Sequence, residues 1–360
     1  MADSTSPKST EEQPHGGLPA ALTFLARAGL NPNPWPVALG YLGLLTLAEM
    51  ILVFVAVPVG VGFHMGLLFI LLLHSSLAWQ DSGYHFLLGL IFVPLIRIIS
   101  VTLPLAGFPL VAWFLITSLP LFAAAIVIMR LLNLSWSDAG LVWRGLPLQL
   151  LFGLIGIGLG TAEYLILRPE PLVDDFRLEK VLLPALILLF STGYLEELIF
   201  RRIMQRTAIE RLGHWSGLIY VALLFAVLHL GYRSLVDFVF VLLVGILFGW
   251  FVTKTNSLVG VTMAHGLTNI WLFLVMPFLT LGPLTTFTES NKLTPLVTDS
   301  TVEAAVPSVE FSTPQSAQSP PIRNLTDASP LEEKPLSLPA VVADEGIPYP
   351  QAQTETTVAP

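Results

Sequence analysis

Cysteine is absent from this 360-residue chain. Its absence excludes disulfide bonds, thiolate metal sites, a cysteine nucleophile and cysteine-linked lipid anchors. Charged residues are scarce as well, at 12%, against about 25% in an ordinary soluble domain. Hydrophobic residues reach 54%. A water-soluble fold of this length would leave large apolar patches exposed, so we expect the lipid bilayer to surround most of the chain.

Charge is also missing from the middle of the chain. The formal net charge is −8, but the residues from Glu289 onward hold ten acidic and three basic side chains, and the first nineteen residues contribute a further −2. The intervening stretch is left with a balance of +1. Charge therefore gives no reason to expect a nucleic-acid partner. The polar start of the chain also lacks the pattern of a signal peptide.

The two ends of the chain are polar. Residues 1–18 and 288–360 are rich in Ser, Thr and Pro, the second also in acidic residues, and neither has hydrophobic periodicity. Segments of this kind bury too little surface to offset the entropy that is lost on ordering. We expect both to be disordered tails, with two groups of transmembrane helices between them, in residues 19–144 and 145–281.

Long apolar stretches fill the region between the tails. A helix needs about 20 apolar residues to cross the hydrocarbon core of a bilayer. The stretches are continuous and Leu-rich rather than alternating, which is typical of helices and not of barrel strands. We predict an all-α fold, a polytopic transmembrane helical bundle of eight or nine spans. The candidate spans lie near residues 37–60, 62–79, 84–104, 108–129, 146–167, 181–200, 215–231, 234–253 and 257–281.

Basic residues gather at three of the predicted connections. Arg130 and Arg144 flank the connection after the fourth span, and Lys254 follows the eighth. Four arginines follow the sixth span, namely Arg201, Arg202, Arg206 and Arg211. Because cytoplasmic loops carry an excess of Lys and Arg, we expect these three connections on the cytoplasmic side. The N-terminus is then inside and, with nine spans, the acidic tail outside. We expect an integral multi-pass protein of the plasma membrane.

Two adjacent carboxylates lie at the end of the sixth apolar stretch. In TGYLEELIFRR, Glu196 and Glu197 follow fifteen nearly uncharged residues that start at Val181. An acidic residue at the centre of a span costs about 2.5–3.5 kcal/mol, so ionisable groups there usually have a function. Neighbouring residues point about 100° apart on a helix, which directs at least one carboxylate to the protein interior. Arg201 shares a face with Glu197 and is expected to pair with it, leaving Glu196 freer to act. The alternative is an amphipathic helix end with both carboxylates solvated.

Polar residues at helical spacing also occur in two later spans. FAVLH places Phe225 one turn before His229, and HGLTN places His265 and Asn269 on one face of the ninth span. A lone histidine in an apolar helix is more often structural than catalytic, and here the polar neighbours single out two of them. We assign no role to the other histidines of the apolar region, which are His64, His74, His85 and the loop residue His214.

The depth of these residues can be compared along the chain. If the sixth helix continues to Leu212 and turns at Gly213, Glu196 lies seventeen residues before the turn and His229 sixteen after it. In an antiparallel hairpin both then lie about 24–26 Å from the turn. No Pro or Gly interrupts the sequence between Glu197 and Leu212, and glycine is a frequent helix stop. We therefore predict a long sixth helix that brings the two residues to one level.

Taken in order, the three motifs resemble the signature of the CPBP family of intramembrane proteases, also called the Abi or type II CAAX prenyl endopeptidase family. That signature reads EExxxR, then FxxxH, then HxxxN or HxxxB. The matching residues here are Glu196 and Glu197 with Arg201, Phe225 with His229, and His265 with Asn269. The resemblance covers about residues 145–281, which would form the catalytic transmembrane domain.

The resemblance implies hydrolysis of a peptide bond within or near the membrane. Glu196 would be the general base that activates water, assisted by His229, and Glu197 with Arg201 would form a supporting pair. His265 and Asn269 would stabilise the oxyanion of the tetrahedral intermediate. The expected partner is a membrane-embedded peptide or protein substrate, with prenylated CAAX-type proteins as one class.

Other mechanisms fit the same residues. Glu196, His229 and His265 would also make a three-ligand zinc site with an open position for water, although the HExxH motif is absent. We favour a mechanism that requires no cofactor. A proton-coupled transporter also uses intramembrane Glu and His, but the chain lacks the internal symmetry of many transporters. A non-catalytic membrane immunity or scaffold protein is the remaining alternative.

Overall fold

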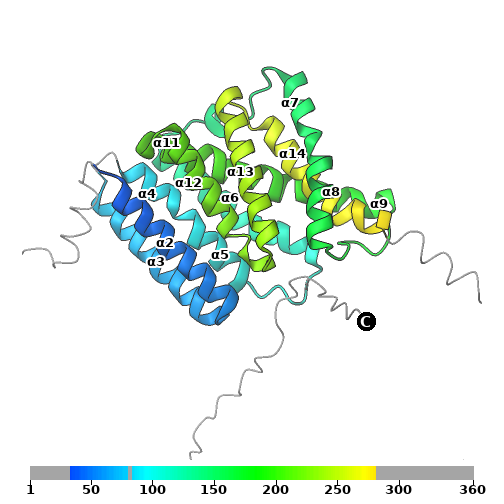
Figure 1. Ribbon diagram of the computed structural model, residues 1–360, viewed down its shortest axis with the longest axis horizontal. Helices are drawn as coiled ribbons and strands as arrows, with labels where there is room; N and C mark the ends of the chain where they lie inside the picture. The colour runs from blue at the N-terminus through cyan, green and yellow to red at the C-terminus, as the bar shows by residue number, and fades with distance from the viewer. Residues whose placement is uncertain (1–32, 80–82, 281–360) are drawn as a thin grey trace, which may run out of the picture. The chain divides into compact units, whose positions relative to one another are not determined.

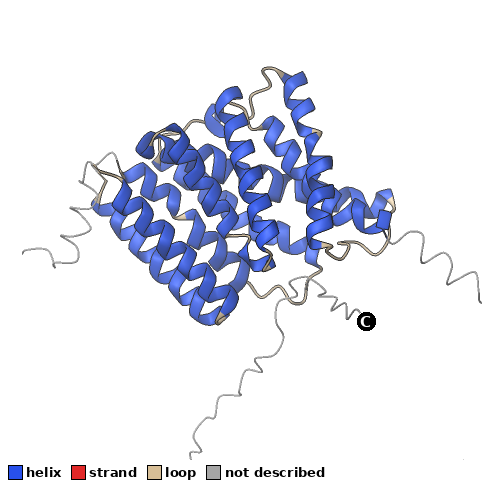
Figure 2. Ribbon diagram, viewed as in Figure 1, coloured by secondary structure: helices blue, strands red, loops and turns tan. Residues whose placement is uncertain are grey.

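The computed structural model describes residues 33–79 and 83–280. The tails predicted at 1–18 and 288–360 lie outside these residues. The described part of the chain contains helices and no strands (Figure 2), and nine of its helical stretches are long and apolar enough to cross a membrane. The predicted all-α polytopic fold is therefore confirmed.

The nine stretches follow one another with short connections (Figure 1). Several combine an α-helix with 3₁₀ or π-helical segments, which are labelled η. Their bounds are Trp35–Phe54 (α2), Val57–Leu77 (α3), Tyr84–Thr102 (α4, Tyr84–Leu90; α5, Phe92–Thr102), Leu110–Leu131 (α6), Leu146–Leu167 (α7, Leu146–Gly153; α8, Ile155–Leu167), Leu178–Leu212 (α9, Leu178–Ile187; η2, Leu188–Tyr194; α10, Leu195–Glu197; η3, Leu198–Met204; α11, Gln205–Leu212), His214–Tyr232 (α12, His214–Val227; η4, Leu230–Tyr232), Leu235–Thr255 (α13) and Val259–Thr280 (α14, Val259–Ile270; η5, Trp271–Val275). A 3₁₀ turn, Trp136–Ala139 (η1), lies between α6 and α7.

The first span ends earlier than predicted, and the second span begins earlier. The first span was expected to reach residue 60, but α2 ends at Phe54 and α3 already begins at Val57. Pro58 occupies one of the first two positions of α3. Proline fits the first turn of a helix but cannot continue one from before, because it lacks an N–H and disfavours helical backbone at the preceding residue. The break therefore falls just before Pro58.

The sixth helix continues to Leu212, as predicted, and is the longest of the nine stretches. It runs for 35 residues without interruption from Leu178 to Leu212, or about 52 Å, and ends at Gly213 with φ +89°. Its hydrogen bonding is not regular, however. The three residues of α10, which include Glu196 and Glu197, lie between the π-helical segments η2 and η3. Such segments are rare and frequently occur at functional sites.

Glycines hold α14 close to its neighbours. A Cβ added to Gly193 in η2 would lie 2.9 Å from the carbonyl oxygen of Thr262. On the other side, a Cβ on Gly160 in α8 would lie 2.5 Å from the carbonyl oxygen of Thr268. Small residues at such crossings let membrane helices approach backbone to backbone. The sixth span and α8 are thereby fixed against the helix that carries His265 and Asn269.

The N-terminal helices pack on the same bundle. α2 and α3 lie side by side in Figure 1, and α2 also contacts α12 and η4. The phenol of Tyr220 in α12 donates a 2.9 Å hydrogen bond to the carbonyl of Ala38 in α2. Large apolar side chains nevertheless stay exposed on outer faces, for example Leu178 at 78% and Leu235 at 77%. Such surfaces suit lipid rather than water.

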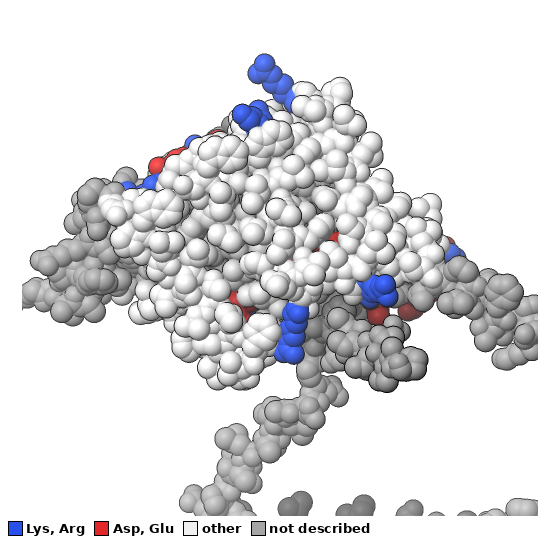
Figure 3. Space-filling view, viewed as in Figure 1, with Lys and Arg blue, Asp and Glu red and all other residues white. Residues whose placement is uncertain are grey.

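The arginines predicted to follow the sixth span lie within its helix, which runs to Leu212, and there Arg202 and Arg206 contact the other two basic connections. Arg202 donates to the carbonyl oxygen of Asp138, in the connection after α6, and its Nη1 lies 2.7 Å from Oδ1 of Asn256, which follows α13. Arg206 adds a 3.1 Å ion pair to the Asp138 carboxylate. Figure 3 shows one face of the molecule as almost free of charge, with charged side chains mainly near its upper and lower edges. These residues therefore lie at a common end of the helices, and the cytoplasmic location of that end stays a prediction.

Candidate active site

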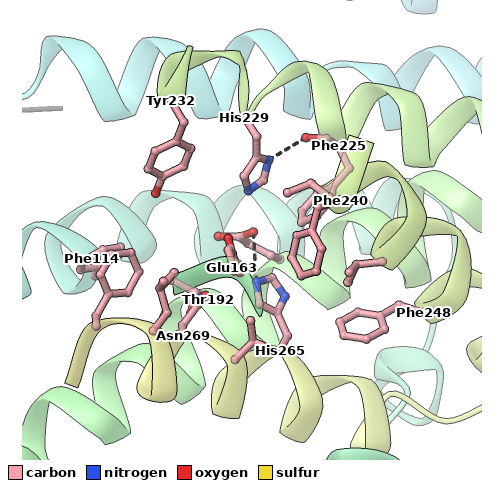
Figure 4. Close-up of a pocket in the computed structure, with 16 residues that line it drawn as sticks. Phe114, Glu163, Thr192, Phe225, His229, Tyr232, Phe240, Phe248, His265 and Asn269 are labelled. Carbon is pink, nitrogen blue, oxygen red and sulfur yellow. Dashed lines mark hydrogen bonds and ion pairs between the residues drawn. The ribbon is translucent and has the colours of Figure 1, made fainter. Parts of the chain in front are cut away.

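A cavity of about 110 Å³ lies among the helices of the C-terminal half. Four of the residues predicted from the motifs line it, and so do a second carboxylate, Glu163, and a set of aromatic rings. The motif residues in its wall are Glu196, His229, His265 and Asn269. Figure 4 shows His229 on one side of this cavity, facing His265 and Asn269 on the other. Two predicted residues, Glu197 and Arg201, do not line it.

The two neighbouring glutamates have different surroundings. Glu197 is completely buried, whereas the side chain of Glu196 is 32% exposed and faces the cavity. Glu197 Oε2 lies 3.3 Å from Nε of Arg201, and Oε1 lies 2.8 Å from Nδ1 of His265. The expected pairing of Glu197 with Arg201 is thus present, and Glu196 is the carboxylate that a molecule in the cavity would meet.

The aromatic ring of Phe225 packs against the guanidinium group of Arg201. Its ring lies 4.5 Å from the guanidinium carbon of Arg201, and the ring of Phe248 lies on the same guanidinium at 5.9 Å. A cation over the face of an aromatic ring is attracted by about 2 kcal/mol or more when both are desolvated. The terminal nitrogens of Arg201 have no hydrogen-bond partner among the described residues. The aromatic rings are therefore a principal support of this buried cation.

His265 is oriented by Glu197. The Glu197 carboxylate accepts the hydrogen bond, so Nδ1 of His265 is the donor and carries a proton. The other ring nitrogen, Nε2, then points away from Glu197. Nε2 lies 3.8 Å from Oε2 of Glu196. A histidine held by a carboxylate on one ring nitrogen presents the other in a fixed direction. His265 thereby connects the buried glutamate with the one that faces the cavity.

His229 is oriented by its own helix. Nδ1 donates a 2.9 Å hydrogen bond to the carbonyl oxygen of Phe225, one turn earlier. Nε2 is then the nitrogen that can accept a proton in the neutral ring. The ring of Tyr232 stacks near it, with centroids 6.3 Å apart. Phe225 therefore has two roles: its carbonyl orients the imidazole of His229, and its ring lies against the guanidinium of Arg201.

Asn269 is held by a residue of the sixth span. Its Nδ2 donates a 2.8 Å hydrogen bond to Oγ1 of Thr192, which in turn donates to the Leu188 carbonyl at 2.6 Å. An amide nitrogen has two hydrogens, so one remains for a molecule in the cavity. Thr192 itself lines the cavity.

Three polar residues of this region were not predicted. Glu163 in α8 is 8% exposed and lines the cavity, and Figure 4 places it between His229 and His265. Tyr232 also lines the cavity, and Asp237 in α13 is fully buried with both carboxylate oxygens unpaired among the described residues. Glu163 could have been predicted, because it is a lone carboxylate within an apolar span. Nothing in the sequence marks Tyr232.

The positions of Glu196, His229 and His265 test whether these residues could bind zinc together. Within residues 33–79 and 83–280 no group of three or more His, Asp and Glu side chains lies close enough together to hold a metal ion. Nδ1 of His229 is turned to a carbonyl and Nδ1 of His265 to a carboxylate, so only the two Nε2 atoms would be available to a metal. At these separations the described side chains do not form a three-ligand zinc site, and we assign no step to a metal.

The histidines to which no role was assigned lie away from the cavity. His64 is 3.2 Å from the carboxylate of Glu49, and His74 shares a 2.8 Å hydrogen bond with Tyr41. His85 lies 3.9 Å from Glu210. Each contacts a neighbouring helix, as expected of structural residues.

These features define a multi-pass helical membrane protein with a carboxylate and histidine cavity among its spans. Residues 178–271 match the family model described as "Type II CAAX prenyl endopeptidase Rce1-like". This match confirms the resemblance to the CPBP proteins over that segment and supports a protease of the CAAX type. The matched segment contains all six predicted site residues and excludes Glu163. No curated protein and no solved structure shows significant similarity to the chain.

Proposed function

We propose that the protein is an intramembrane endopeptidase that hydrolyses a peptide bond of a membrane-associated protein or peptide. One observation carries the proposal: Glu196, His229, His265 and Asn269 reach one cavity from three different spans. Two potential proton acceptors, Glu196 and His229, and two potential donors, His265 and Asn269, around one cavity are what amide hydrolysis by activated water requires.

In this mechanism Glu196 removes a proton from the attacking water. It is the glutamate that faces the cavity, and it needs a second group to orient the water. Nε2 of His229 is free to accept a hydrogen bond, because Nδ1 already donates to Phe225. The oxygen of the water then attacks the carbonyl carbon, and the proton passes to the leaving nitrogen as the C–N bond breaks.

The developing oxyanion is stabilised by two residues of the ninth span, Asn269 and His265. Asn269 offers the hydrogen that Thr192 leaves free. His265 offers Nε2–H when its ring is protonated, since Nδ1 is occupied by Glu197. Protonated His265 and Arg201 together balance the charges of the two glutamates. Removing one oxyanion donor in a comparable site costs about 10²–10³-fold in kcat.

The apolar wall of the cavity suggests the kind of substrate. Aromatic and aliphatic side chains make up much of it, among them Phe114, Phe240, Phe248, Leu272 and Phe273. We propose a membrane-embedded peptide or protein, with prenylated CAAX-type proteins as one class, cleaved at the plasma membrane without a cofactor or nucleic acid.

The deciding experiment is cleavage of a fluorogenic library of membrane peptides, including prenylated CAAX peptides, by purified protein in detergent. The wild type is compared with Glu196→Gln, each with and without a strong chelator. We expect activity that survives the chelator and falls at least about 10²–10⁴-fold in Glu196→Gln, because a general base is lost.

Two results would contradict this mechanism. Activity that is abolished by the chelator and restored by Zn²⁺ would assign Glu196, His229 and His265 to a metal. Equal activity of wild type and Glu196→Gln, with both folded, would remove Glu196 from the reaction. Absence of cleavage by the folded wild type across the library would favour the transporter or scaffold alternative.

A further inference from the structure

A second buried cluster of charged residues lies in the N-terminal helices. Glu49 in α2 is completely buried, and its Oε1 lies 2.7 Å from Nε of Arg97 in α5 and 3.2 Å from Nε2 of His64 in α3. Arg97 is 8% exposed. None of the three residues lines the cavity. They also lie outside the segment that matches the protease family.

This cluster is connected to the cavity through the backbone. Nη2 of Arg97 donates a 2.6 Å hydrogen bond to the carbonyl oxygen of Leu228. Helix α12 ends at Val227, so that carbonyl is one of the groups at a helix end that lack a partner within the helix. A cation at this position also interacts favourably with the helix dipole. Arg97 thus caps the helix at the residue before His229.

The peptide unit that joins Leu228 to His229 is consequently held at both of its polar atoms. Its oxygen accepts from Arg97, and its N–H, which belongs to His229, donates to the Ala226 carbonyl at 2.9 Å. The imidazole is held independently by the Phe225 carbonyl. His229 has φ −93° and ψ 1°, the bridge region in which many active-site residues lie.

A second arginine fixes the other end of the same short segment. Arg233, which follows η4 and has φ 53°, donates a 2.6 Å hydrogen bond from Nη2 to the Val53 carbonyl at the end of α2. The segment from Leu228 to Arg233 carries both His229 and Tyr232. It is therefore attached at each end to the N-terminal helices.

We propose that Glu49 and Arg97 are positioning residues for His229, and that the N-terminal helices hold this histidine in its reactive orientation through the Leu228 carbonyl. Glu49 fixes the guanidinium through Nε and leaves Nη2 for the carbonyl. Lysine cannot replace this arrangement, because a single ammonium on a flexible chain lacks the rigid fork that serves two partners. The inference rests on the proposed function of His229 in catalysis.

The test uses the full-length protein in detergent and two variants of the cluster. Glu49→Met combined with Arg97→Met removes both charges together, which is often neutral for stability, whereas removal of one partner alone leaves a buried charge unpaired. Arg97→Lys is the second variant. Tyr41→Phe is the matched control, because it removes a buried polar contact between the same helices α2 and α3 without reaching Leu228.

Two quantities are measured on each folded variant. One is kcat and KM for the best peptide of the library. The other is the ring resonance of His229 in protein labelled with ¹³C-histidine, assigned by its loss in His229→Gln. We expect kcat to fall about 10- to 100-fold in both cluster variants, as for a misplacement of about 1 Å, with KM unchanged. The His229 resonance should shift or broaden in both and stay constant in Tyr41→Phe.

Several results would overturn the inference. An unchanged kcat in the folded cluster variants would show that the cluster is only structural, and so would a fall in kcat without a change in the His229 resonance. A shift of equal size in Tyr41→Phe would show a general effect of the N-terminal helices. If the wild type cleaves nothing, the proposed function fails, while the resonance of His229 still reports whether Arg97 positions it. If the double variant does not fold, Arg97→Lys and the control decide.

Discussion

Two clusters in this protein use the same residue types in different halves of the chain. In the N-terminal half a fully buried Glu49 contacts His64 and Arg97, and in the C-terminal half a fully buried Glu197 contacts His265 and Arg201. Both join separate helices. Only the second cluster includes a residue that lines the cavity, and only there does a further glutamate lie beside it.

The comparison teaches that buried charge is not sufficient to define a site. Ionisable residues within spans mark function by default, and by that rule both clusters would qualify. What separates them is access, because a group reacts only when water and substrate can reach it. The N-terminal cluster is instead directed at a backbone carbonyl, so its effect on the chemistry is indirect.

The largest difference between the clusters should appear in catalysis. Glu196→Gln is expected to lower kcat about 10²–10⁴-fold, whereas Glu49→Gln should act mainly on stability and reduce kcat far less in the molecules that remain folded. Initial rates, normalised to the folded fraction from size-exclusion chromatography, measure both. Equal losses of kcat in the two folded variants would remove the distinction.

Substitution of the supporting pair, Glu197 and Arg201, should have the next largest effect, mainly on stability. Arg201→Met leaves Glu197 buried without its cation and should lower the free energy of unfolding by about 3–5 kcal/mol. Adding Glu197→Gln to Arg201→Met should recover much of that loss without restoring activity, since His265 then lacks its carboxylate. Thermal unfolding in detergent and peptide cleavage are the two measurements. Recovery of full activity in the double variant would show that His265 does not depend on Glu197.

Helix packing around the cavity should have a smaller effect. Gly160→Ala places a Cβ 2.5 Å from the Thr268 carbonyl oxygen, whereas Gly158, two residues earlier on α8, has nothing within 4 Å of the corresponding position. Overpacking costs about 1–3 kcal/mol, while Gly158→Ala should be neutral or stabilise by up to about 1 kcal/mol through helix propensity. Unfolding curves of the two variants compare them directly. Equal stability would mean that α8 shifts freely along α14.

The smallest expected effect lies at the charged end of the helices. The hydroxyl and backbone N–H of Ser135, with Arg206 nearby, lower the pKa of Asp138 to about 2. Because this value is below the ordinary value of about 3.9, the stabilisation is present above about pH 4 and is lost as the pH falls towards 2. Asp138 is partly exposed, so the contribution should stay below about 1 kcal/mol. Asp138→Asn should therefore be less stable than wild type at pH 6 and equal to it near pH 2. A constant difference at both pH values would contradict the assignment.

The helices and the motif residues could be predicted from the sequence for clear physical reasons. Apolar runs of spanning length identify the helices, and spacing of three to four residues brings Phe225 and His229, or His265 and Asn269, onto one face. The long sixth helix followed from the absence of Pro and Gly between Glu197 and Leu212. These are local properties, and each depends on residues that are close in sequence.

Contacts between helices could not be predicted in the same way. The hydrogen bond from Asn269 to Thr192 requires the close crossing at Gly193, and the position of Glu163 requires the crossing at Gly160. Periodicity gives the face of a helix but not its neighbour. The bond from Arg97 to the Leu228 carbonyl is still less accessible, because it joins residues 131 positions apart and its acceptor is a backbone atom. The π-helical segments beside Glu196 have no simple sequence signal.

The size of the cavity has a consequence for turnover. At about 110 Å³ it is well below the roughly 300–1,000 Å³ of pockets that enclose drug-sized ligands, so it has room for a few water molecules and a small part of a substrate. A longer stretch of polypeptide would enter only if the surrounding helices separate. The apparent affinity is then the intrinsic affinity multiplied by the fraction of molecules that are open. In that case opening of the bundle, rather than bond cleavage, would be the rate-limiting step of turnover.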